Sequence, residues 1–78
     1  MTFVDQDYRK LKNIIATNMR RYRLRLGLTQ EEAAEQAGVT DKFWQRIELK
    51  SQVDVPSIST LVKIATVLKV KPHQLLIP

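Results

Sequence analysis

Apolar residues recur at helical spacing along most of the chain. The first stripe steps by three or four residues and consists of Leu11, Ile15, Met19, Tyr22 and Leu26. This spacing predicts an amphipathic helix. Either Asp5 or Asp7 is expected to cap it, and Gly27 is expected to end it.

The stretch from residue 29 to 48 predicts two short helices joined by a tight turn. Thr29 and Glu32 have the spacing of a capping box, and the first helix then carries a small apolar face of three alanines. Gly38 follows that helix, where a left-handed backbone is needed, and Thr40 is expected to cap the next one. Trp44 and Ile47 repeat three residues apart and should point into the core from the second helix.

The remainder of the chain predicts two further helices. Ser57 is a plausible cap for a helix whose apolar face consists of Ile58, Leu61, Val62, Ala65 and Leu68. Pro72 suits the first position of a short last helix that packs through Leu75 and Leu76. Five helices with short connections predict a compact all-α fold, in one domain covering residues 1–78.

The second helix of the 29–48 stretch presents a polar outer face. Its expected members are Asp41, Lys42, Phe43, Gln45 and Arg46. Arg46 can donate a bidentate pair to guanine, and Lys42 can reach the same acceptors singly. Asp41 either accepts from a cytosine amine or offsets the helix dipole, and Phe43 either touches a thymine methyl or covers the seam against the preceding helix. Such a face is typical of a DNA-binding helix-turn-helix.

The same residues resemble a known family. Their spacing is that of the helix-turn-helix of phage-repressor and Cro-like (XRE-type) regulators, carried here by Gln30, Ala34, Gly38, Trp44 and Ile47. The likeness covers about residues 14 to 77 and implies a five-helix lambda-repressor-like DNA-binding domain. Restriction–modification controller proteins are similar in consisting of little else, and antitoxins also use the domain. The chain departs from the family pattern after Glu48, where a slightly longer loop without glycine leads to Pro56.

The resemblance also implies roles for individual residues. Gln30 is expected to anchor a phosphate at the helix start, with Thr40 and Lys50 as the next candidates. Arg23 and Glu48 are expected to form an ion pair between the first and third helices. The last helix of the family faces a partner subunit, which favours Leu76 and Ile77 as dimer contacts.

The charge balance agrees with a polyanionic partner. Thirteen basic residues against eight acidic ones give a formal net charge of +5 and a pI of about 9.9. Residues 9–25 contain seven basic residues and no acidic one. We interpret most of these as a solvated helix face, because the apolar stripe lacks the bulky aromatic residues of a membrane-surface helix.

Catalytic chemistry and cofactors are not expected. The chain has no cysteine, and the single His73 has no partner at metal-ligand spacing. Glu31, Glu32 and Glu35 are interpreted as solvated charges on a helix surface rather than as paired catalytic carboxylates. We expect no cofactor, no metal and no small-molecule ligand. The absence of a membrane-length apolar run or a signal-peptide pattern favours a cytoplasmic protein.

The sequence therefore predicts a non-enzymatic, sequence-specific regulator of transcription, either repressor or activator, that binds double-stranded DNA. A domain this small reads few base pairs, so a homodimer on a near-palindromic operator is expected. Its contacts should come from the apolar end of the chain, with Phe3 or Val4 of an N-terminal extension (residues 1–13) contributing. The alternative is a protein-interaction module or an antitoxin component with the same fold.

Overall fold

The computed structural model describes the backbone of residues 2–78 and the side chains of residues 7–78. Within these residues the fold is all-helical. The elements in chain order are α1 (Thr2–Arg25), α2 (Gln30–Ala37), α3 (Asp41–Glu48), α4 (Ile58–Leu68) and the 3₁₀ helix η1 (Pro72–Leu76). Four α-helices are thus described, and the fifth predicted helix is a 3₁₀ turn instead of an α-helix.

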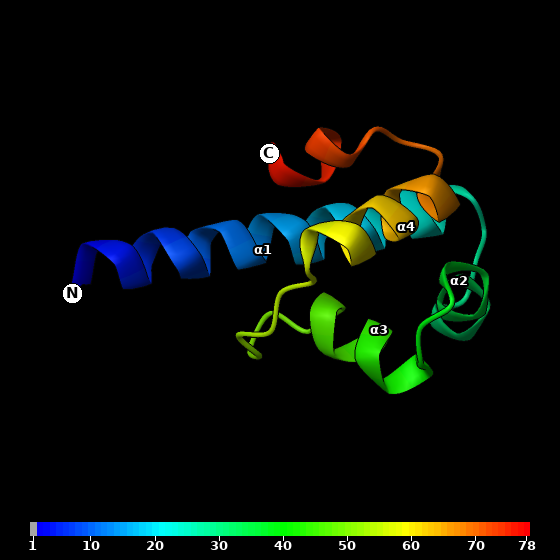
Figure 1. Cartoon of the computed structure of the whole chain (residues 1–78), viewed down its shortest axis with the longest axis horizontal. Helices are drawn as coiled ribbons and strands as arrows, with labels where there is room; N and C mark the ends of the chain where they lie inside the picture. Colours follow the sequence, from blue (N-terminus) through cyan, green and yellow to red (C-terminus); the bar gives the residue numbers. More distant parts are fainter. Residues whose placement is uncertain (1) are drawn as a thin grey trace.

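The long helix α1 is the axis of the molecule. Its second half has α3 packed on one side and η1 on the other, while its first half extends beyond the body (Figure 1). The predicted caps are wrong: the helix is already formed at Thr2, so Asp5 and Asp7 lie inside it. Phe3 and Val4 have side chains outside the described residues.

The predicted apolar stripe is confirmed at its centre, where Ile15, Met19 and Tyr22 are buried on one face of α1. Its two ends, Leu11 and Leu26, are exposed at 41% and 37%. The same buried face carries three polar side chains, Lys12, Asn18 and Arg23. Residues with strong hydrogen-bonding groups therefore occupy positions where an apolar residue would be expected.

The helix-turn-helix forms through its own local hydrogen bonds. Thr29 Oγ1 accepts from the backbone N–H of Glu32 at 3.0 Å, and Glu32 Oε1 accepts from the backbone N–H of Thr29 at 2.8 Å. Gly38 ends α2 with φ of +72°, and its N–H donates to the carbonyls at the end of that helix. Thr40 Oγ1 then caps α3 by accepting from the N–H of Phe43 at 3.1 Å.

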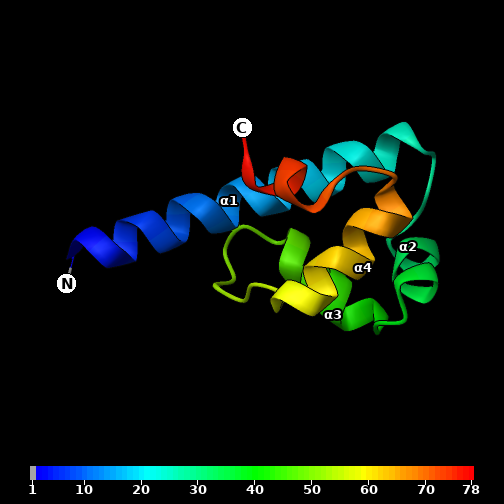
Figure 2. The ribbon, with the colours of Figure 1, turned by 45° about the horizontal axis from the view of Figure 1, so that its top comes forward.

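The core is formed by residues from all four α-helices and η1. Trp44 and Ile47 of α3 are completely buried, as predicted, together with Ile64 and Leu75. The view from a second direction keeps α4 against the helix-turn-helix, with η1 lying along α1 (Figure 2). Two residues of the predicted α4 face are exposed instead: Ile58 at 82%, because it begins the helix beyond the edge of the core, and Val62 at 44% on its flank.

Candidate nucleic-acid interface

The two faces of α3 differ sharply in burial. Trp44 and Ile47 fix one face in the core, and Lys42, Gln45 and Arg46 are exposed on the other. Because the buried pair is spaced three residues apart, the polar side chains project away from the body as a set. An exposed row of one amide and two cationic side chains on a short, firmly packed helix can donate hydrogen bonds to an external partner.

Two residues predicted for that outer face lie partly inside. Phe43 is half-buried and packs against the core, so it covers the seam. Asp41 is also half-buried, and its Oδ1 is buried with no hydrogen-bond partner among the described residues. Both residues lie in the first turn of α3, close to the turn from α2, and this position removes part of their surface from solvent.

Arg46 is oriented by an acidic residue of the following loop. Its Nε donates to Asp54 Oδ2 at 2.8 Å, and its Nη2 lies 2.6 Å from the same oxygen. The two side chains remain 61% and 37% exposed. The loop after α3 therefore reaches back to the outer face of that helix.

Glu48, at the end of α3, accepts hydrogen bonds from side chains of α1, α2 and α3. Its Oε2 accepts from Arg23 Nε at 2.7 Å and from Trp44 Nε1 at 2.6 Å. Its Oε1 accepts from Arg23 Nη2 and Gln30 Nε2, at 3.0 and 3.1 Å. The Arg23–Glu48 ion pair is almost inaccessible to solvent, and its four donors compensate for the burial of the carboxylate. This arrangement fixes the orientation of α3 relative to α1 and α2.

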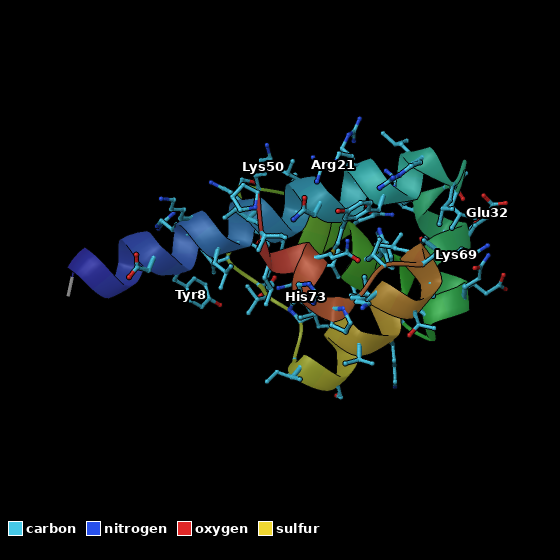
Figure 3. The ribbon with its side chains drawn as sticks, turned by 90° about the horizontal axis from the view of Figure 1, so that it is seen from above. Tyr8, Arg21, Glu32, Lys50, Lys69 and His73 are labelled. Carbon is cyan, nitrogen blue, oxygen red and sulfur yellow. The ribbon has the colours of Figure 1, made fainter. Side chains whose placement is uncertain are left out.

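The three predicted phosphate-binding residues have different environments. Gln30 is half-buried, and its amide nitrogen is engaged by Glu48. Thr40 is exposed but uses its hydroxyl oxygen to cap α3. Lys50 is exposed in the loop after α3 and is visible at the surface in Figure 3. Of the three, only the Lys50 side chain has no structural hydrogen bond within the described residues.

Sequence reasoning missed Lys12, which holds the end of α3 and the loop after it. Its ammonium group donates to the backbone carbonyls of Leu49 and Gln52 at 2.8 and 3.0 Å, and it lies 3.4 Å from that of Arg46. The residue is only 1% exposed. Burial lowers the pKa of Lys12, and the negative charge of Asp54 partly offsets that shift. The available signal was its spacing, because Lys12 lies three residues before the buried Ile15.

Asn18 plays the corresponding role at the end of the chain and was also missed. Its side-chain amide donates to the carbonyls of Gln74, Leu75 and Ile77 at 3.3, 3.0 and 2.8 Å. The two predicted dimer contacts lie in this region. Leu76 is half-buried and packs against the core, whereas Ile77 is 52% exposed.

The described residues form neither a metal site nor a membrane-spanning helix. No group of three or more His, Cys, Asp or Glu side chains there is arranged to hold a metal ion. None of the helices described combines the length and the apolar character needed to cross a membrane.

Comparisons with known proteins agree with this geometry. Residues 14–76 match a family described as a helix-turn-helix domain. The chain is 35% identical over 72 residues to a protein named as a hypothetical transcription factor from Neisseria meningitidis serogroup B, covering 92% of this chain and 66% of that relative. It is also similar to the crystal structure of a hypothetical transcription factor from Neisseria, with a TM-score of 0.81 and 35% identity, covering 87% of this chain and 76% of that one. The chain therefore belongs to the helix-turn-helix domain family.

Proposed function

We propose that the protein is a DNA-binding regulator of transcription that inserts α3 into the major groove of double-stranded DNA. The observation that carries this proposal is the outward-facing row of Lys42, Gln45 and Arg46 on a helix fixed by Trp44 and Ile47. Side chains of these types match base edges in the major groove: Arg donates to guanine, and Gln pairs with adenine. The names of the two Neisseria relatives, each called a transcription factor, support the same function.

The finer proposal is sequence-specific binding of the phage-repressor type, in which some residues contact base edges and others contact phosphates. Arg46, Gln45 and Lys42 read base edges, whereas Lys50 and Thr40 contact the phosphate backbone. Gln30 contributes through its backbone N–H at the start of α2, because its side chain is engaged by Glu48. Phe43 touches a thymine methyl only with the ring edge that the core leaves uncovered. The negative charge of Asp41 interacts favourably with the positive end of the α3 dipole.

The proposal is tested by Arg46→Ala, measured on DNA selected for binding from a random pool. We expect the variant to lose about 1–3 kcal/mol of binding free energy on the selected sequence and to lose base preference at one position per half-site. Arg9→Ala is the matched control, because Arg9 is an exposed arginine on the first half of α1. That control should change only the salt-dependent, sequence-independent affinity.

Salt dependence separates this function from the alternatives. Binding to duplex DNA should weaken with a log–log slope of about −0.9 for each phosphate neutralised. A protein-interaction module, or an antitoxin that acts only on a protein partner, would show no such titration. An equal loss for every sequence in Arg46→Ala would make Arg46 a phosphate contact and would refute its role in base reading.

We further propose that the protein binds a near-palindromic operator as a homodimer through the end of the chain. Ile77 is half-exposed there, and a groove of about 410 Å³ between α1 and Pro78 is lined in part by Ile14 and Thr17. Leu76 contributes less than its position suggested, because it already packs against the core. Sedimentation of the wild-type protein at micromolar concentration checks this: a monomer that still binds one half-site tightly would overturn it.

A further inference from the structure

We propose that Asp54 is a specificity-determining residue that holds Arg46 ready to read guanine. This inference rests on the proposed function, because it concerns how Arg46 is presented to DNA. Asp54 lies in the loop after α3 and is half-buried. Its carboxylate contacts Arg46 through one oxygen, which receives Nε at 2.8 Å and lies 2.6 Å from Nη2.

The contact uses one edge of the guanidinium and leaves another edge available. Arginine has five N–H donors in a rigid planar fork. Asp54 occupies the side edge formed by Nε and Nη2. The end of the fork, with one N–H from Nη1 and the second N–H from Nη2, keeps two parallel donors. That pair matches O6 and N7 of guanine. The ion pair with Asp54 and a bidentate pair with guanine can therefore exist together on the same side chain.

The position of Asp54 is itself fixed by the body of the protein. The same loop contains Gln52, two residues before Asp54, and the carbonyl of Gln52 accepts from the buried ammonium of Lys12 at 3.0 Å. This ammonium group is shielded from solvent, since Lys12 is only 1% exposed, and it also donates to the carbonyl of Leu49. A loop anchored in this way can hold the carboxylate at a constant place beside α3.

Orientation matters because a free arginine side chain has many rotamers. Fixing them before binding removes conformational entropy that DNA binding would otherwise have to overcome. The negative charge of Asp54 also opposes binding to phosphates in general, since its side chain is 37% exposed beside the interface. Both effects favour the sequence with guanine at this position over random DNA.

The test compares Asp54→Ala and Asp54→Asn with the wild type. The measurement is the affinity for the selected DNA duplex, for the same duplex with guanine replaced at the position read by Arg46, and for a random duplex. We expect Asp54→Ala to reduce the preference for guanine roughly ten-fold while its affinity for the random duplex stays equal or rises. Asp54→Asn should recover part of the preference, because its amide oxygen still accepts from Arg46.

A matched control and a double variant make the result specific. Asp7→Ala removes an exposed acidic charge from the first half of α1 and should leave the preference unchanged. In Arg46→Ala, adding Asp54→Ala should cause no further loss of preference, because a positioning residue acts only through its partner. An unfolding curve is measured for each variant to check that the fold is retained.

The outcomes distinguish a failure of the Asp54 inference from a failure of the proposed role of Arg46 in reading bases. If Arg46→Ala leaves base preference unchanged, the proposed role of Arg46 is wrong, and Asp54 has nothing to position. If Arg46→Ala abolishes the preference while Asp54→Ala leaves it intact, the inference about Asp54 alone is wrong. A stronger preference for guanine in Asp54→Ala would also overturn it, because Asp54 would then compete with DNA for Arg46.

Discussion

The helix-turn-helix and the surroundings of α1 satisfy their backbone groups in different ways. In the helix-turn-helix, Thr29 and Thr40 each cap a helix by accepting from an N–H three residues ahead. Around α1, Lys12 and Asn18 donate to carbonyls 34 to 59 residues away along the chain. One region is held by local bonds, and the other is held by side chains that join distant segments.

This difference determines what each bond contributes. A local cap stabilises its own helix end and remains partly replaceable by water, because the cap is exposed. Lys12 and Asn18 are each only 1% exposed, and each is shared by several carbonyls. Removing either donor leaves a partly buried set of carbonyls without this partner and also releases a segment from the body. We therefore expect the long-range donors to contribute more stability than the local caps.

The largest effect is expected for Lys12→Met. Methionine keeps most of the volume of the buried stem but donates nothing to the carbonyls of Leu49 and Gln52. We expect the free energy of unfolding to fall by about 2–4 kcal/mol, measured by denaturant titration, because the lost bonds came from a charged, buried donor. Lys10→Met is the matched control, since Lys10 is an exposed lysine of the same helix. Equal effects of the two substitutions would show that the carbonyl contacts contribute nothing.

An intermediate effect is expected for Asn18→Ala. The substitution removes the amide that binds the carbonyls of Leu75 and Ile77 at 3.0 and 2.8 Å. We expect a loss of about 1–3 kcal/mol, smaller than for Lys12 because the donor is neutral. Amide hydrogen exchange should show the loss of protection concentrated in η1. The control is Asn13→Ala, on an exposed asparagine of α1, and unchanged exchange in η1 would refute the role of Asn18.

The sequence predicted the locally determined region well for a physical reason. The capping box, Gly38, Thr40, Trp44 and Ile47 interact within a few residues of one another, so spacing alone identifies them. The burial of Lys12 and Asn18 depends on where α3 and η1 pack, and spacing does not give that. Their placement on the same face as Ile15 and Met19 was a readable signal, but a polar residue there is normally assigned to solvent.

In the candidate interface too, features set by local spacing could be predicted and those set by the tertiary fold could not. The exposure of Lys42, Gln45 and Arg46 could be predicted, because α3 has a regular period and two core residues that set its orientation. The engagement of Gln30 by Glu48 and of Arg46 by Asp54 could not, because both pairs join residues through the tertiary fold. The 3₁₀ geometry of η1 was likewise unpredicted, since a segment of five residues is too short for a helical period to decide between the two forms.

The smallest effect is expected for the local cap at α2, and it should depend on pH. Hydrogen bonds with the backbone N–H and the side chain of Thr29 lower the pKa of Glu32, which is at the surface. Because the folded-state pKa lies below that of the unfolded chain, the charged form stabilises the fold above the ordinary glutamate pKa, and this stability is lost as pH falls through the lowered value. Wild type should thus exceed Glu32→Ala in stability at neutral pH, with the difference shrinking as pH falls through the lowered pKa of Glu32. Glu32→Gln is the control, because glutamine can make the same bond to Thr29 without titrating. Its advantage over Glu32→Ala should not vary with pH, and a wild-type advantage that is equally constant would show that the Glu32 carboxylate has the same pKa in the folded and unfolded chains.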